Sequence, residues 1–412
     1  MLHRSRLLTV LLAATALTLT GCAAPTSPAA APEESTAPGG HGDIAGAREL
    51  SEPPLALVTV DPAGAVHQLD LLDESVAELG AVPAPTNATT DGRYVFADSG
   101  DGVAIVDSGR WTWDHVDHFH YYLAEPALLG EVAGRGPATV ATTMSSTTGG
   151  TGVFLAGSGE AVLLDTEALS KGDIVERFRI QTAPHEGLVV PLGSFALTTE
   201  PRQGVAASVI VREEDGMPVP GVSAECADAR GTITTRVGAV IGCADGALLA
   251  TLADGAVELE RIPYPEGVAA PSATAFAGRD GRAAVAADAG APGIWLLDTR
   301  ERAWTLLPVD RPIVQATAVD DEAAHALALG AEGLVLVIDG TTGALVAQTE
   351  PLVADATVTD AAAPAVIADQ HRAYLNAPAE RRLYEIDYAD GARIARTFDA
   401  PAEPAFLAET GR

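Results

Sequence analysis

Residues 94–106, with the sequence YVFADSGDGVAIV, show the pattern that decides the fold. Two short apolar runs flank a turn of Ser, Gly and Asp, which is typical of a β-hairpin. The same arrangement returns at residues 153–164, 283–297 and 324–338, and an Asp and a second turn often follow it. No long stretch has the 3.6-residue periodicity of an amphipathic helix. The sequence therefore predicts an all-β protein.

These hairpins recur along the chain at a nearly regular interval. Comparable units begin near residues 87, 137, 185, 225, 273, 317 and 365. A four-stranded antiparallel blade takes about 40–50 residues, so this period predicts a single β-propeller. We assign it to residues 55–412 and expect seven blades, with residues 55–82 helping to complete the last. Eight blades, with residues 55–82 in the extra one, are the alternative, and an array of β-sandwich domains is another.

Composition excludes several classes of protein. The 412 residues carry a formal net charge of −31, with 56 acidic against 25 basic side chains. Such a surface repels nucleic acid, so no nucleic-acid partner is expected. Lys171 is the single lysine, which leaves little material for P-loop or Schiff-base chemistry. Three cysteines are too few for a disulfide-rich scaffold.

The N-terminal segment indicates where the protein works. Residues 1–21 have a basic start and an apolar run that is too short to span a bilayer, as in a signal peptide. The run ends in Leu-Thr-Gly before Cys22, which resembles a bacterial lipobox and implies cleavage and lipidation at Cys22. Residues 22–54 are then predicted to be the lipidated cysteine and a flexible tether. We expect a monomer outside the cytoplasmic membrane that touches the membrane through its lipid anchor alone.

Cys226 and Cys243 are the two cysteines within the predicted propeller. An oxidising compartment permits them to form a disulfide across a strand-turn-strand stretch. Two separate buried thiols are the alternative. A redox-active pair is not expected, because the chain has no Cys-x-x-Cys motif.

One stretch stands out chemically, the sequence WTWDHVDHFHYY at residues 111–122. It contains three of the nine histidines, two of the four tryptophans and two of the seven tyrosines. His118 and His120 are two positions apart, so an extended strand would point both imidazoles to one face. Converging neutral imidazoles suit Zn²⁺, Cu²⁺ or Ni²⁺. A loop of solvated histidines, or simple aromatic packing, is the alternative interpretation.

Other side chains are candidates to complete such a site. Asp117 and Asp114 would orient an imidazole or supply an oxygen ligand. His115 would point away from His118 if the strand stayed extended, and is therefore a less favoured candidate. We place the histidine stretch in the connection from the first repeat to the second, over the mouth of the channel. His185, followed by Glu186, opens the third repeat and is predicted to bring a third nitrogen and a carboxylate to this site.

The sequence resembles the periplasmic zinc metallochaperones of the AztD type in three features: the histidine stretch, His185 with Glu186, and the cysteine pair. This resemblance implies a β-propeller that binds zinc and delivers it to the solute-binding protein of an ABC-type zinc importer. It also implies His118, His120 and His185 as zinc ligands. The sequence departs from the family in its N-terminal stretch, which offers only His41 and neighbouring carboxylates for a second site.

Two other functions remain open at this point. The propeller would be a protein- or glycan-binding lipoprotein if the histidines held no metal. It would be a metal-dependent hydrolase if a metal kept an open position beside a general acid or base. No Gly-x-Ser-x-Gly or His-Glu-x-x-His motif supports the hydrolase, and we predict no enzymatic activity. The preference for zinc over copper or nickel rests on the resemblance, because imidazole binds all three.

Overall fold

A computed structural model describes residues 42–412 of the chain, except residues 116, 292, 355 and 358–362. The predictions made for the signal peptide, for lipidated Cys22 and for His41 lie outside these residues. Within them, no helix is long and apolar enough to cross a membrane.

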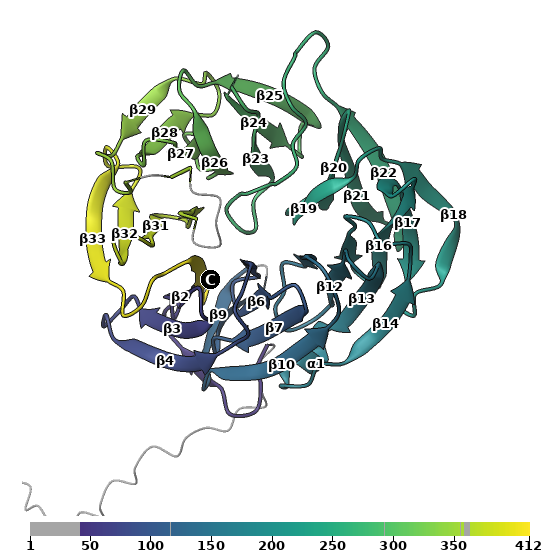
Figure 1. Cartoon of the computed structure of the whole chain (residues 1–412), viewed down its shortest axis with the longest axis horizontal. Coiled ribbons are helices and arrows are strands. Elements are labelled where there is room, and N and C mark those ends of the chain that lie inside the picture. Colours follow the sequence, from purple (N-terminus) through teal and green to yellow (C-terminus); the bar gives the residue numbers. More distant parts are fainter. Residues whose placement is uncertain (1–41, 116, 292, 355, 358–362) are drawn as a thin grey trace, which may run out of the picture. The chain divides into compact units, whose positions relative to one another are not determined.

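In the described residues, eight antiparallel sheets follow one another as the blades of a ring (Figure 1). The first four blades, from inner to outer strand, contain β34 (Phe406–Thr410), β2 (Ala56–Val60), β3 (Ala65–Asp70) and β4 (Val76–Ala81); β5 (Asn87–Thr90), β6 (Tyr94–Asp98), β7 (Gly102–Asp107) and β10 (Ala127–Ala133); β11 (Ala138–Thr142), β12 (Gly150–Leu155), β13 (Glu160–Asp165) and β14 (Glu176–Gln181); and β15 (Val189–Leu192), β16 (Phe195–Arg202), β17 (Val205–Glu213) and β18 (Pro218–Glu225).

The other four blades complete the circle. They contain β19 (Arg230–Thr234), β20 (Ala239–Cys243), β21 (Gly246–Ala253) and β22 (Ala256–Pro263); β23 (Ala284–Asp288), β24 (Gly293–Asp298) and β25 (Ala303–Pro308); β26 (Ile313–Ala318), β27 (His325–Gly330), β28 (Val335–Asp339) and β29 (Leu345–Gln348); and β30 (Val366–Ala368), β31 (Ala373–Ala377), β32 (Arg382–Asp387) and β33 (Arg393–Asp399). In the sixth blade, an isolated bridge from Ala277 to Ala286 of β23 takes the place of an inner strand, while Gly278 bridges to Ala318 of β26 in the seventh blade. A five-residue helix, α1 (Thr166–Ser170), joins β13 to β14 and is capped by Asp165.

The predicted β-propeller is confirmed, but the preferred count of seven blades is wrong for the described residues. Strands β2, β3 and β4 do not join the last repeat. They form a blade of their own, whose inner strand β34 comes from the other end of the chain. Val60 pairs with Phe406 and Ala56 with Thr410, which closes the ring. The alternative of eight blades describes this arrangement.

The core lies between the faces of neighbouring blades and is built mostly from Val, Leu, Ile and Ala. In one cluster, Phe96 of the second blade packs with Val153 and Leu155 of the third. All five residues of β2 are buried, and so are all six of β7. These strands read as continuous apolar runs because both faces of each blade are covered. This packing gives the ring a rigid frame for the loops at its two ends.

The predicted disulfide is confirmed, with Cys226 and Cys243 joined by a 2.02 Å S–S bond. Cys226 follows β18 and Cys243 ends β20, so the bond links the fourth and fifth blades. Both sulfurs belong to an apolar cluster that spans the same two blades.

The prediction that residues 22–54 form a flexible tether is wrong for the last part of that segment. Residues Arg48–Leu50 form β1, which pairs with β9 (Phe119–Leu123), so that Glu49 lies opposite Tyr122. The short polar strand has no local β signal. Its structure comes from pairing with a partner some 70 positions later in the chain, which composition alone does not reveal.

Candidate metal centre

The histidine stretch folds as a hairpin that is inserted into the second blade. Strand β8 (Arg110–Asp114) pairs with β9, and β1 adds a third strand to form a small separate sheet. The hairpin leaves the ring after β7, the third strand of the blade, and the chain returns to the ring as the fourth strand, β10. It is therefore not the connection between two repeats that the sequence analysis expected.

The base of this hairpin is fixed firmly to the ring. Trp111 and Tyr122 are both buried and stack with their ring centroids 5.3 Å apart. The guanidinium of Arg93, which is paired with Asp107 at 2.6 Å, lies 4.0 Å from the Trp111 ring centroid. Such buried aromatic and cation–π contacts hold a side chain in one position. The tip of the hairpin thus projects from a rigid base.

At the tip, two imidazoles point their Nε2 atoms at each other. The Nε2 atoms of His118 and His120 are 3.0 Å apart. The Nδ1 atom of His118 lies 2.8 Å from Asp117 Oδ1, and the Nδ1 atom of His120 lies 2.6 Å from Glu49 Oε1. Each ring is therefore held by a different carboxylate and presents its other nitrogen to the same small space.

This arrangement matches the chemistry of a metal ligand pair. A carboxylate at Nδ1 selects the tautomer in which Nδ1 carries the proton and Nε2 carries a lone pair. Two lone pairs that face each other repel, so a shared proton or a cation between them stabilises the pair. Two imidazole nitrogens bound to one tetrahedral zinc, at about 2.0–2.1 Å each, lie about 3.3 Å apart. The expected convergence of His118 and His120 is thus present.

His115 also faces the pair, which corrects the expectation that it would point away. Its ring stacks on His118 at 4.8 Å, and its Nδ1 lies 3.3 Å from Asp117 Oδ1. The chain turns between β8 and β9, where the backbone N–H of His115 donates to the carbonyl of His118 at 2.8 Å. Because the segment is a turn and not an extended strand, the alternation of faces does not apply.

Asp117 connects these rings electrostatically. Hydrogen bonds from His118 and then His115 lower the pKa of its carboxyl group. Donor atoms of His115, Asp117 and His118 all lie within 4.8 Å of one another. Asp114 is exposed at the end of β8, opposite Phe119 in the strand pairing, and is not a member of this group.

His185 lies elsewhere in the molecule. Each strand of a blade runs from one end of the ring to the other, and successive strands run in opposite directions. The connection after a third strand and the connection after a fourth strand therefore lie at opposite ends of the ring. The hairpin follows a third strand, whereas His185 lies between β14, a fourth strand, and β15. The ring of His185 is buried against Phe154, and its nitrogens lie 2.7 Å from Ala183 O and 2.9 Å from Thr199 Oγ1.

The predicted meeting of His185 with the pair is therefore corrected. Both of its nitrogens are engaged, one by Ala183 of the same connection and the other by Thr199 of β16. Glu186, the carboxylate expected beside it, is exposed and forms an ion pair with Arg230 at 2.8 Å. Neither residue contributes to the cluster on the hairpin.

Glu49 is the member of the cluster that the sequence analysis missed. It comes from β1, 71 residues before His120 in the chain. The segment before it also lies on the hairpin, because Gly42 accepts a hydrogen bond from Trp111 Nε1 at 3.1 Å. A side chain at Gly42, where φ is +83°, would collide with the ring of Trp113. No sequence pattern around Glu49 could have placed it here.

The molecule is thus a β-propeller that carries histidines and carboxylates on an inserted, well-anchored hairpin. Its fold is of the AztD type. Two structures of AztD from Citrobacter koseri, one described as the apo protein, superpose with TM-scores of 0.75 and 0.76. Each covers 87% of this chain and 98% of its own, at 22% and 20% sequence identity. No family model matches the chain, and no curated protein matches it in sequence.

Proposed function

We propose that this chain is a zinc-binding metallochaperone that works outside the cytoplasmic membrane. It is a carrier rather than an enzyme, and zinc is its cargo. The observation that carries this proposal is the pair of Nε2 atoms 3.0 Å apart, on rings that two separate carboxylates hold. The fold shared with AztD and the resemblance of the histidine stretch support the same function.

In this proposal His118 and His120 are the two principal ligands. His115 or Asp117, whose donor atoms lie within 4.8 Å of one another and of a donor atom of His118, supplies a third. Asp117 and Glu49 orient the imidazoles and raise their basicity. All of these donors are nitrogen or oxygen atoms, and imidazole with carboxylate is a common ligand set for zinc.

The exposure of the site suits transfer. About half of the His118 side chain is open to solvent, and His120 is less exposed. Ligands from a partner can approach an exposed ion while its first ligands still hold it. We propose that the partner is the solute-binding protein of an ABC-type zinc importer. The net charge of −31 favours capture of a cation and steering of a basic surface on that partner.

The test is a zinc titration of the metal-free protein beside the double variant His118→Ala/His120→Ala. We expect about one tightly bound zinc per chain, and a loss of affinity greater than the 10–100-fold that removal of a supporting partner costs. His325→Ala is the matched control, because His325 also pairs with a carboxylate, Asp321, at 2.7 Å. Zinc binding that survives the double variant, or that disappears in the control, would overturn the assignment.

Delivery requires a separate experiment. Zinc-loaded protein is mixed with the zinc-free solute-binding protein, and transfer is followed with a competing chelator present. Transfer faster than the release of zinc to the chelator alone supports direct handover. Transfer at the rate of free dissociation would reduce the role to zinc binding without delivery.

A further inference from the structure

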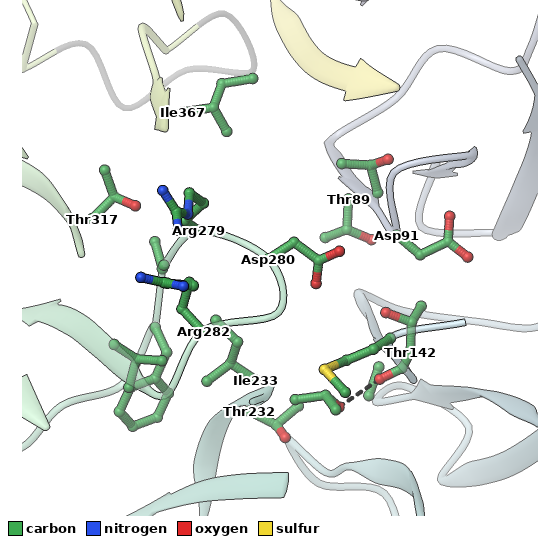
Figure 2. Close-up of a pocket in the computed structure, with 18 of the residues that line it drawn as sticks. Thr89, Asp91, Thr142, Thr232, Ile233, Arg279, Asp280, Arg282, Thr317 and Ile367 are labelled. Atoms are coloured by element: carbon green, nitrogen blue, oxygen red, sulfur yellow. Dashed lines mark hydrogen bonds between the residues drawn. The ribbon is translucent and has the colours of Figure 1, made fainter. Parts of the chain in front are cut away.

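A second candidate site lies in the central channel, and none of its residues belongs to the histidine cluster. A cavity of about 290 Å³ opens there, near the lower end of the roughly 300–1,000 Å³ that is typical of small-molecule sites. Seven threonines contribute to its wall. Thr90, Thr142 and Thr234 are the last residues of the inner strands β5, β11 and β19, so hydroxyl groups surround this end of the channel (Figure 2).

The charged side chains of the cavity are unusual for so acidic a protein. Three arginines and two aspartates line it, a local excess of positive charge in a chain of net charge −31. Figure 2 shows Arg279 and Arg282 together on one side, while Asp280 points toward Asp91 and Thr89. The cavity therefore has one wall with Arg279 and Arg282 and an opposite wall that combines carboxylate and hydroxyl groups with Arg412.

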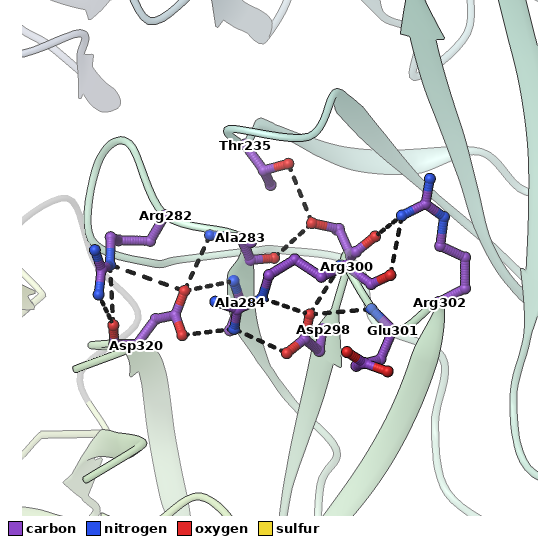
Figure 3. A network of polar contacts seen from close by, with 10 residues as sticks. Thr235, Arg282, Ala283, Ala284, Asp298, Arg300, Glu301, Arg302 and Asp320 are labelled. Atoms are coloured by element: carbon purple, nitrogen blue, oxygen red, sulfur yellow. Dashed lines mark hydrogen bonds and ion pairs between the residues drawn. The ribbon is translucent and has the colours of Figure 1, made fainter. Parts of the chain in front are cut away.

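The wall with Arg279 and Arg282 is incompletely neutralised. Arg282 donates to the backbone carbonyl of Asp320 at 2.9 Å, but its Nε is 3.8 Å from the Asp320 carboxylate (Figure 3). That carboxylate is already engaged by Arg300 at 2.8 Å and by the backbone N–H groups of Ala283 and Ala284. In the part of the chain that the structure covers, no carboxylate lies within ion-pair distance of Arg279. Arg282 is thus paired with Asp320 at long range only, and Arg279 is the guanidinium with charge left for a ligand.

The opposite wall holds buried polar atoms that lack partners. In the described residues, Thr89 Oγ1, Asp91 Oδ2 and Arg412 Nε are buried without a hydrogen bond. All three residues line the cavity. A buried polar atom without a partner costs roughly 1–3 kcal/mol, and such atoms call for an explanation in a folded protein. These three atoms are covered by protein, so a molecule in the cavity does not reach them, and they show only that this wall is polar beneath its surface.

We infer that the channel cavity binds a small hydroxycarboxylate. Its carboxylate lies against Arg279 and Arg282, which can grip it through charge-assisted hydrogen bonds. Its hydroxyl groups lie toward the threonine hydroxyls of the wall. Those of Thr143, Thr232 and Thr234 already donate to backbone carbonyls and keep lone pairs that accept from a ligand. This inference does not depend on the metal site, because no residue of the cavity belongs to the histidine cluster.

The test is calorimetric titration of the metal-free full chain with L-malate and with citrate. Inorganic phosphate is the comparison, because any cationic pocket attracts it. We expect saturable binding of at least one hydroxycarboxylate, more tightly than phosphate. Arg279→Gln should weaken it by about 10–100-fold, the loss expected for a charged hydrogen bond.

Two further variants make the result decisive. Arg302→Gln is the control, since Arg302 pairs with Glu260 at 3.1 Å and does not line the cavity. Thr142→Val tests the hydroxyl-bearing wall without changing charge. No saturable binding of malate or citrate would overturn the inference, and so would binding that Arg279→Gln leaves unchanged. Equal affinity for phosphate would show a general anion pocket and would equally overturn it.

Discussion

The hairpin and the ring use the same side chains in opposite ways. His118 and His120 lie on the hairpin, partly exposed, with their nitrogens turned toward each other. His185 lies in the ring, buried, with each nitrogen bonded to an atom of its own neighbourhood. A buried histidine whose nitrogens both bond to fixed groups of the ring stabilises the fold, whereas two histidines whose Nε2 atoms meet only each other at the surface can bind a ligand. Variants of the ring should therefore change stability, and variants of the hairpin should change zinc affinity.

The largest effect is expected at Glu409, a fully buried residue of β34. Burial raises the pKa of its carboxyl group from 4.5 to about 8, although Arg412 opposes this shift. The folded state therefore holds the proton more tightly than the unfolded state. The contribution of this group to the free energy of unfolding is fully present below pH 4.5. It is lost as the pH rises toward 8, and the loss is roughly 3–5 kcal/mol.

Glu409→Gln should remove that loss. The free energy of unfolding, measured in urea between pH 5 and 9, should therefore change less with pH in the variant than in the parent protein. Glu385→Gln is the control. Glu385 is also buried, but Arg396 and Arg372 pair with it, so its loss should lower stability at every pH. Zinc affinity should stay unchanged in both variants. Parallel pH profiles for the parent protein and Glu409→Gln would contradict the prediction.

A smaller effect on stability is expected from His185→Ala. The change leaves a space beside Phe154 and removes two hydrogen bonds, which together should lower the free energy of unfolding by about 2–3 kcal/mol. Denaturant unfolding measures this loss, and a zinc titration should show none. A variant that folds normally but no longer binds zinc would show that His185 belongs to the metal site, and would contradict the division between ring and hairpin.

The smallest effect is expected from Glu49→Ala on the hairpin. It removes the carboxylate that holds His120 Nδ1, so zinc should bind about 10-fold more weakly. Stability should change by no more than about 0.5 kcal/mol, because the side chain is half exposed. Glu52→Ala, an exposed neighbour outside β1, is the control for charge alone. Equal zinc affinities in the two variants would remove Glu49 from the site.

The sequence predicted what depends on local pattern. Residues 94–106 became β6 and β7, and the repeat interval identified the propeller because each blade is one local unit. The approach of His118 to His120 was also predictable, since two positions are a local distance. The strand β34 that completes a blade lies at the far end of the chain from its partner β2, and this long-range pairing changed the blade count.

The remaining errors have the same origin. Glu49 reaches His120 through strand pairing across 71 positions, which no periodicity encodes. His115 faces the pair because the chain turns, a conformation that the spacing of residues does not reveal. His185 was misplaced because its distance from the histidine stretch depends on which end of the ring each connection occupies. The end of the ring at which a connection lies follows from the number of strands before it. The inserted hairpin adds two strands within the second blade and so hides that number in the sequence.

Ring closure has a consequence for the order in which the protein folds. Pairing of β2 with β34 joins segments that are nearly 350 residues apart, and such long-range contacts form slowly because a large loop must close first. The hairpin depends on this event, since Thr112 Oγ1 donates to the carbonyl of Gly411 at 2.9 Å, just beyond β34. The hairpin therefore reaches its final anchorage only when the two ends of the ring have met. Under the proposed function, zinc affinity then reports whether the ring has closed, and a chain with an open ring would bind zinc weakly.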